Sequence, residues 1–291
     1  MEGVRAQVAR DCEAEVSDVG PEHLYLDLLK KCLTRSISRE QTRPIQFAQG
    51  TLRYSLYAPL RSLLSLAGLS LARTAKVDPA IRAEGKDWPA EAETMIGLKR
   101  LDNLQHCVEA VLREEIPGDL IETGVWRGGA SIFMRGVLKV YGDRARKVWV
   151  ADSFCGLPAP DPVSYPADAG DRHHTFPQLA VSLEEVRENV ARYGLLDEQV
   201  QFLAGWFCDT LPLAPIDRLA VLRLDGDMYG STMEALTHLY PKLSVGGYVI
   251  VDDYGAVPGC RSATEDFRAR QGITEPLEQI DWTGVFWKRL R

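Results

Sequence analysis

Residues 120–133 read LIETGVWRGGASIF. This stretch begins with a short apolar run, continues through three glycines and ends in a helical pattern. This order is typical of the strand–turn–helix unit of a parallel α/β sheet. Glycines at such a turn let a ligand approach the backbone where the helix begins. The stretch therefore predicts both a fold class and the place of a ligand site.

Further strands and helices alternate on the C-terminal side of this stretch. The apolar runs lie at 148–152, 200–203, 219–225 and 248–253, and helical patterns follow Ser182 and Ser231. Each of these two serines has a glutamate three residues later in its opening turn, which we interpret as a capping box. The tail offers two closing strands, at 276–280 and 285–290. We therefore predict an α/β fold with a doubly wound, mostly parallel sheet.

The N-terminal third has a different texture. Leucines recur at helical spacing over residues 24–33, residues 95–115 form an amphipathic pattern, and little before residue 119 resembles a strand. Residues 51–72 are apolar, but Arg53 and Arg61 interrupt them, and the uncharged part is too short for a membrane span. We expect a helical N-terminal extension and lid over 1–115, and the ligand-binding sheet domain over 116–291.

The amino-acid composition limits the classes of molecule that this protein is expected to bind. The chain has 291 residues, 45% of them hydrophobic and 26% charged, with a formal net charge of −7. These values exclude disorder and give no basic footprint for nucleic acid or anionic lipid. The six cysteines form no CxxC pair, and the charged residues 1–16 lack the apolar run of a signal peptide. We expect a reduced, cytoplasmic protein that acts on a small molecule or binds another copy of itself.

Two acidic residues mark a cofactor site. Glu122 ends the first strand of the sheet domain, and Asp152 ends the second, 23 residues past Gly129. An acid at about that distance binds the ribose hydroxyls of an adenosine cofactor in doubly wound folds. The order E-x-G-x-x-x-G-G departs from the G-x-G-x-x-G turn that serves a pyrophosphate, which argues against a nicotinamide oxidoreductase. It resembles the first motif of S-adenosylmethionine methyltransferases, and a carboxylate beside the turn suits that positively charged cofactor.

More carboxylates follow the next two strands. Asp225 and Asp227 end the fourth strand, and Asp252 and Asp253 end the fifth. Carboxylates gathered at one sheet edge repel unless they are protonated or joined to a cation, and oxygen ligands alone favour Mg²⁺. We assign Asp225, Asp252 and Asp253 as Mg²⁺ ligands, and Asp225 also as the base that deprotonates an acceptor hydroxyl. The alternative is that any single one of these acids only caps a helix or a turn.

Five motifs in one order resemble the macrocin O-methyltransferase family. They are TMIGLKRLDNLQHC (94–107), LIETGVWRGGA (120–130), WVADSFCGLP (149–158), LAVLRLDGDMYGST (219–232) and VIVDDYGAVPGCR (249–261). Family members methylate sugar hydroxyls of macrolides and related glycosylated natural products with S-adenosylmethionine and Mg²⁺. The resemblance is dense over residues 88–291. It also implies a homo-oligomer, a dimer or higher.

The resemblance implies individual contacts. For S-adenosylmethionine these are Thr94, Met95, Glu122, Thr123, Gly124, Val125, Trp126, Ser131, Asp152, Ser153, Gly205, Trp206, Phe207 and Asp209. It supports the three Mg²⁺ ligands and makes His173 and Tyr254 candidate substrate neighbours. Gly230 and Cys155 depart from the family pattern, and the segment 42–87 is longer and more apolar than the corresponding family linker; these departures bear on which acceptor is used. We expect methylation of a deoxysugar hydroxyl on an antibiotic-type natural product; the alternatives are a catechol-type O-methyltransferase and a scaffold without activity.

Overall fold

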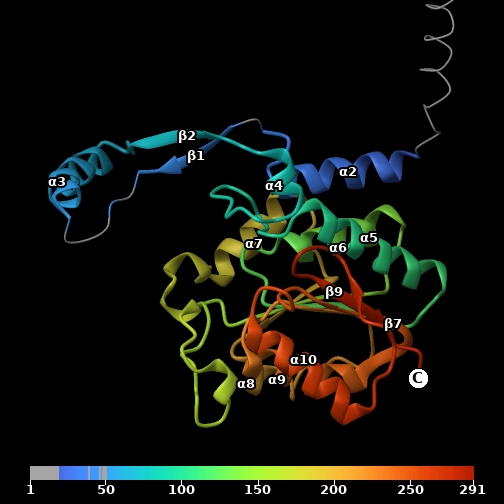
Figure 1. The fold of residues 1–291 in the computed structure, drawn as a ribbon. Coiled ribbons are helices and arrows are strands. Elements are labelled where there is room, and N and C mark those ends of the chain that lie inside the picture. The colour runs from blue at the N-terminus through green and yellow to red at the C-terminus, as the bar shows by residue number, and fades with distance from the viewer. Residues whose placement is uncertain (1–19, 39, 46, 48–50) are drawn as a thin grey trace, which may run out of the picture.

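A seven-stranded sheet forms the centre of the molecule (Figure 1). The computed structural model describes residues 20–38, 40–45, 47 and 51–291. The strands are β3 (Asp119–Thr123), β4 (Val148–Asp152), β5 (Val200–Ala204), β6 (Leu219–Leu224), β7 (Leu243–Val251), β8 (Glu278–Gln279) and β9 (Val285–Lys288). Their order is β5-β4-β3-β6-β7-β9-β8, with β5 to β7 parallel and β9 antiparallel to β7 and β8. The predicted fold class and the two closing strands are confirmed.

Helices cover both faces of this sheet (Figure 1). One layer contains α2 (Pro21–Leu33), α5 (Leu98–Arg113) and α6 (Gly129–Val140), which share one apolar core. The other contains α9 (Tyr229–Leu239) and α10 (Pro258–Gln271), whose apolar residues share a second core with the sheet. The connections after β4 and β5 carry α7 (Leu183–Arg192) and α8 (Phe207–Thr210). Strand order reverses at β3, and ligands bind at such a switch point in open α/β sheets.

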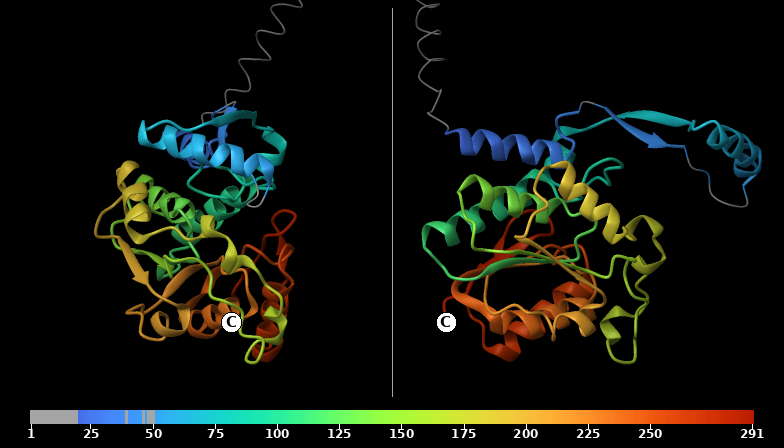
Figure 2. Two further views of the ribbon diagram at one scale, coloured as in Figure 1. Left: turned by 90° about the vertical axis from the view of Figure 1, so that its left-hand side faces the viewer. Right: turned by 180° about the vertical axis from the view of Figure 1, so that it is seen from behind.

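The N-terminal third is helical only in part. Strands β1 (Glu40–Pro44) and β2 (Ala72–Lys76) pair antiparallel and carry α3 (Leu52–Leu66) at their far end. Figures 1 and 2 show this arm reaching away from the sheet domain. The expectation of a helical extension, with little before residue 119 that resembles a strand, was therefore wrong for β1 and β2. Their sequences, EQTRP and ARTAK, lack the apolar alternation by which a half-buried strand is recognised.

The arm presents an uncovered apolar stripe. Five leucines recur every three or four residues along α3, and all are exposed: Leu52 by 78%, Leu56 by 70%, Leu60 by 44%, Leu63 by 66% and Leu66 by 87%. No residue of α3 is buried. A helix with this spacing presents its leucines on one face, which normally packs against another surface.

Several smaller expectations are also decided by the structure. Ser182 caps α7 by accepting the Glu185 N–H at 3.2 Å, as predicted. Ser231 lies inside α9, so the capping box predicted there was wrong. No helix of the described part is long and apolar enough to cross a membrane. Five cysteines are free thiols, while Cys12 and the charged stretch 1–16 lie outside the described residues.

Candidate active site

The turn after β3 lies directly against the end of β6. Gly124 has φ +83°, and a Cβ placed there would meet the backbone oxygen of Asp225 at 1.8 Å. Trp126 also has a positive φ, and its indole N–H donates to the Gln178 carbonyl at 2.9 Å. At position 124 only glycine can combine a positive φ with so close an approach to the Asp225 backbone. The turn therefore joins the predicted cofactor site to the predicted metal site.

Asp152 holds this turn from the neighbouring strand. Its two carboxylate oxygens accept the Val125 N–H at 2.7 Å and the Phe154 N–H at 2.8 Å. Next to it, the Ser153 hydroxyl donates to the Gly156 carbonyl at 2.6 Å. The Ser153 hydroxyl also lies 3.4 Å from Asp152 Oδ1. A carboxylate has about four lone-pair sites, so Asp152 could still accept a hydroxyl of a bound ligand. The structure thus gives Asp152 one role in the fold and leaves it able to take a second.

A cavity of about 350 Å³ opens at this edge of the sheet. Among its walls are eight of the residues predicted to bind the cofactor: Met95, Gly124, Trp126, Asp152, Ser153, Gly205, Trp206 and Phe207. Asp225 and Asp227 line it as well. The cavity lies at the reversal of strand order, where the fold class predicts a ligand.

The other predicted cofactor residues do not line this cavity. Glu122 is buried and accepts from the Ser131 hydroxyl at 2.5 Å and from Arg223 Nη1 at 2.7 Å. Burial raises the pKa of Glu122 to about 7, against the lowering effect of Arg223. Thr94 lies close to Gly129: a Cβ added to Gly129 would lie 2.5 Å from the Cβ of Thr94. None of Thr94, Glu122, Thr123, Val125, Ser131 and Asp209 is among the described residues that line the cavity. Their predicted contacts stay predictions.

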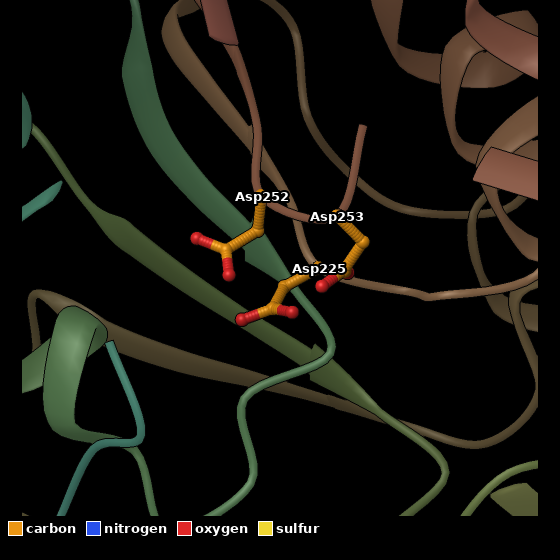
Figure 3. Close-up of side chains that lie close together, drawn as sticks. All are labelled: Asp225, Asp252 and Asp253. Atoms are coloured by element: carbon orange, nitrogen blue, oxygen red, sulfur yellow. The ribbon is translucent and has the colours of Figure 1, made fainter. Parts of the chain in front are cut away.

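The three predicted metal ligands converge. Figure 3 shows Asp225, Asp252 and Asp253 side by side, and one oxygen of each lies within 4.8 Å of the others. Asp225 follows β6, and the other two follow β7, because parallel strands end at the same edge.

The environment of this acidic cluster suits a hard cation. The Oδ2 atom of Asp253 is buried without a hydrogen-bond partner. Burial, then the neighbouring Asp227 and Asp225, raise the pKa of Asp253 well above its ordinary value. Burial and Asp252 likewise raise the pKa of Asp225. An all-oxygen set with one unsatisfied carboxylate oxygen is of the kind that holds Mg²⁺.

A fourth carboxylate stands beside the cluster. Asp227 lines the cavity, and burial together with Asp225 raises its pKa to about 7, although the nearby His173 lowers it. The sequence left Asp227 as a possible helix cap. The first turn of α9 is capped instead by Asp168, which accepts the N–H groups of Tyr229 at 2.6 Å and Gly230 at 3.0 Å.

The two candidate substrate neighbours are placed differently. His173 Nδ1 lies 2.7 Å from Asp171 Oδ2. The His173 ring packs edge-on against the ring of Phe176. His173 is also near enough to Asp227 to lower the pKa of that carboxylate. The Tyr254 hydroxyl donates to Glu265 at 2.8 Å, on α10. Neither belongs to the described walls of the cavity. Substrate contact by either residue stays a prediction.

Two buried arginines among these acids were missed in the sequence. Arg223 lies on β6 two residues before Asp225, and Arg100 lies on α5. Arg223 contacts Glu122, Asp225 and Asp252, and Arg100 contacts Asp252 and Asp281. A charged residue inside the buried strand LAVLRL was the available signal, because arginine is almost never buried without a partner.

The chain is similar to a known protein family over most of its length. The profile described as Macrocin-O-methyltransferase (TylF) matches residues 22–289. The chain belongs to the macrocin O-methyltransferase family. The resemblance drawn from the five motifs is thereby confirmed, and so is the expectation of a methyltransferase.

Individual relatives agree with this assignment. The chain is 54% identical over 266 residues to 8-demethyl-8-(2,3-dimethoxy-alpha-L-rhamnosyl)-tetracenomycin-C 4'-O-methyltransferase of Streptomyces olivaceus, covering 91% of this chain and 92% of the relative. It is 49% identical to mycinamicin III 3''-O-methyltransferase of Micromonospora griseorubida, covering 91% and 96%. The solved structure of the O-methyltransferase NovP superposes with a TM-score of 0.80 at 48% identity, covering 93% of this chain and 100% of that one. The chain is therefore an O-methyltransferase with the fold of the S-adenosylmethionine enzymes.

Proposed function

We propose that this enzyme methylates a deoxysugar hydroxyl of a glycosylated natural product, with S-adenosylmethionine as donor and Mg²⁺ as a required ion. The observation that carries the proposal is the meeting of two sites at one sheet edge. The Gly124 turn lies against the Asp225 backbone, so a cofactor over the turn would lie beside the three clustered carboxylates. The acceptor class rests on the relatives, whose names specify a rhamnosyl tetracenomycin and a mycinamicin.

The chain's own residues would divide the work. Asp152 would bind the ribose, the turn at 124–126 would approach the methionine part, and Trp206 and Phe207 would pack against adenine. Asp225, Asp252 and Asp253 would hold Mg²⁺, which, when bound, lowers the pKa of a coordinated hydroxyl. Placing acceptor and methyl donor in one small cavity then supplies orientation, a large part of many enzymatic rate enhancements.

Asp225 is the proposed base. It lines the cavity, its pKa is raised, and 28% of its side chain stays accessible. Asp227 is the neighbouring carboxylate to compare, because a pKa of about 7 suits proton acceptance near neutral pH. Asp225→Asn should abolish turnover and leave S-adenosylhomocysteine binding measurable. Asp227→Asn should then retain activity; a variant of Asp227 with the larger loss would transfer the role to that residue.

The arm is the proposed lid and the proposed contact with a second copy in a dimer or higher oligomer. Its bare leucines need a covering surface, and residues 40–76 contain five Lys or Arg against one Glu in a chain of net charge −7. A basic, apolar arm suits the acidic body of another copy. Leu56→Glu should lower the mass measured by light scattering or raise the acceptor KM; a variant with neither change would exclude both roles. The same proposal places the enzyme, with its free thiols, in the cytoplasm.

The acceptor and the ion are tested together. Protein stripped with EDTA should bind S-adenosylhomocysteine in a calorimetric titration. Methyl transfer to a panel of deoxysugar glycosides should then require added Mg²⁺. Preference for catechol acceptors such as caffeate would favour the catechol-type alternative. Transfer that is equally fast in EDTA would remove Mg²⁺ from the proposal and leave the acceptor class intact.

A further inference from the structure

Two buried arginines already bind the carboxylates that the proposed ion would use. Arg223 has 1% of its side chain exposed and donates to Asp225 at 2.8 Å and to Asp252 Oδ1 at 2.5 Å. Arg100 has 6% exposed and donates to Asp252 Oδ2. Both oxygens of Asp252 are thus in contact with a permanent positive charge, since arginine does not lose its proton in proteins.

One of these arginines is held in place by a further acid, whereas one acid of the cluster has no arginine partner. Arg100 is fixed by a second buried acid, Asp281, which accepts from its Nε at 3.0 Å. Asp253 makes none of these arginine contacts, and its Oδ2 has no partner. A buried carboxylate cluster is tolerated only where its charge is compensated. Here Arg100 and Arg223 compensate part of the negative charge. The charge of Asp253 is left to be compensated by a bound cation.

We propose that Arg100 and Arg223 are built-in counter-ions of the metal site. They let the chain fold with Asp225 and Asp252 in place before a divalent cation arrives, and they make that cation bind weakly enough to exchange. This inference rests on the proposed function, because it takes these acids as cation ligands. It adds that the affinity of the site is set by residues that bind neither cofactor nor acceptor.

Two effects of opposite sign follow from removing one arginine charge. The metal-free protein becomes less stable, because Asp252 loses a buried partner. The affinity for Mg²⁺ increases, because the ion then neither shares carboxylate oxygens with the guanidinium nor is repelled by its charge. An arginine that only propped the ligands in position would give the reverse: without it the ligands would disperse and Mg²⁺ would bind more weakly.

Arg100→Gln in the full chain is the informative variant. Arg223 is less suitable, because it also contacts Glu122 at the cofactor turn. The matched control is Arg135→Gln on α6. Arg135 is equally buried, with 6% of its side chain exposed, but it pairs with Asp197 at 3.0 and 2.6 Å and contacts none of the clustered acids. The readouts are the Tm in EDTA and in saturating MgCl₂, and the Kd for Mg²⁺ by calorimetry, without cofactor or acceptor.

We expect Arg100→Gln to lower the Tm in EDTA, to enlarge the rise in Tm on adding Mg²⁺, and to tighten Mg²⁺ binding by at least about tenfold. Arg135→Gln should lower the Tm and leave the Mg²⁺-induced rise as in the wild type. Weaker Mg²⁺ binding by Arg100→Gln would overturn this inference and leave the proposed metal in place. A wild type that binds no Mg²⁺ would overturn both.

Arg100→Lys decides the matter if Arg100→Gln does not fold. Lysine keeps the charge but cannot reproduce the guanidinium's contacts with Asp252 and Asp281. A counter-ion role predicts Mg²⁺ affinity close to that of the wild type. A prop role predicts a clear loss of affinity, and that result would refute the proposal.

Discussion

Replacing Asp152 should separate the cofactor role of this residue from its role in the fold. In Asp152→Asn the volume is kept, but only one side-chain oxygen remains to accept the N–H groups of Val125 and Phe154. The ribose would lose a charged acceptor, and hydrogen bonds to charged groups contribute about 1.5–3 kcal/mol. Since 1.4 kcal/mol is tenfold, the Kd for S-adenosylhomocysteine should rise by roughly 10- to 150-fold.

Titration calorimetry on the folded variant is the assay, with circular dichroism to establish folding. Asp161→Asn is the matched control. Asp161 also lines the cavity and also holds its loop by accepting two backbone N–H groups, from Val163 at 3.1 Å and Ser164 at 3.2 Å. Its substitution should leave the Kd within about twofold, well below the cost of one hydrogen bond. A folded Asp152→Asn protein with the wild-type Kd would refute the ribose assignment.

Three further predictions concern the cofactor turn, pH and a helix cap. Gly124→Ala should abolish S-adenosylhomocysteine binding in calorimetry, because its Cβ would collide with the Asp225 carbonyl at 1.8 Å; retained binding would contradict the packing of turn on strand. Burial raises the Glu122 pKa from 4.5 to about 7, so the native state binds the extra proton, and the stability contributed by this group falls as pH rises from about 4.5 to 7. Urea unfolding of Glu122→Gln across that window should show a shallower decline than the wild type, because Asp227 and its neighbours still contribute; an unchanged pH slope would argue against the role of Glu122. Ser182→Ala removes the cap of α7 and should cost about 1 kcal/mol, a Tm loss of about 2–4 °C by calorimetry, whereas Ser231→Ala should cost less; equal losses would refute the capping argument.

The sequence was informative where chain order alone fixes geometry. Parallel strands end at one edge, so Asp225, Asp252 and Asp253 could be brought together without coordinates. Glycine spacing and the acid at Asp152 predict a cofactor turn for a similar reason, and the structure places Gly124 and Asp152 in the wall of one cavity.

The features that sequence missed depend on distant contacts. Arg100 reaches Asp252 from a helix 152 residues away, and no local pattern announces that pairing. Likewise the β1–β2 pair has no apolar period, and Asp168 caps α9 from 62 residues before Gly230. Such contacts follow from how the elements pack, which periodicity does not report.

The pairing of Arg100 with Asp281 has a consequence for synthesis on the ribosome. These partners are 181 residues apart, so at about 5–20 residues per second Arg100 emerges roughly 10–40 s before its partner. Thr283, which donates to the Asp252 carbonyl at 3.0 Å, comes still later. A chain stalled or cut short before residue 281 would contain every proposed ligand, but it would lack the Asp281 carboxylate that fixes Arg100 and the Thr283 hydroxyl that donates to the Asp252 carbonyl. The proposed metal ligands therefore have their full set of supporting contacts only after residues 281–283 have been made.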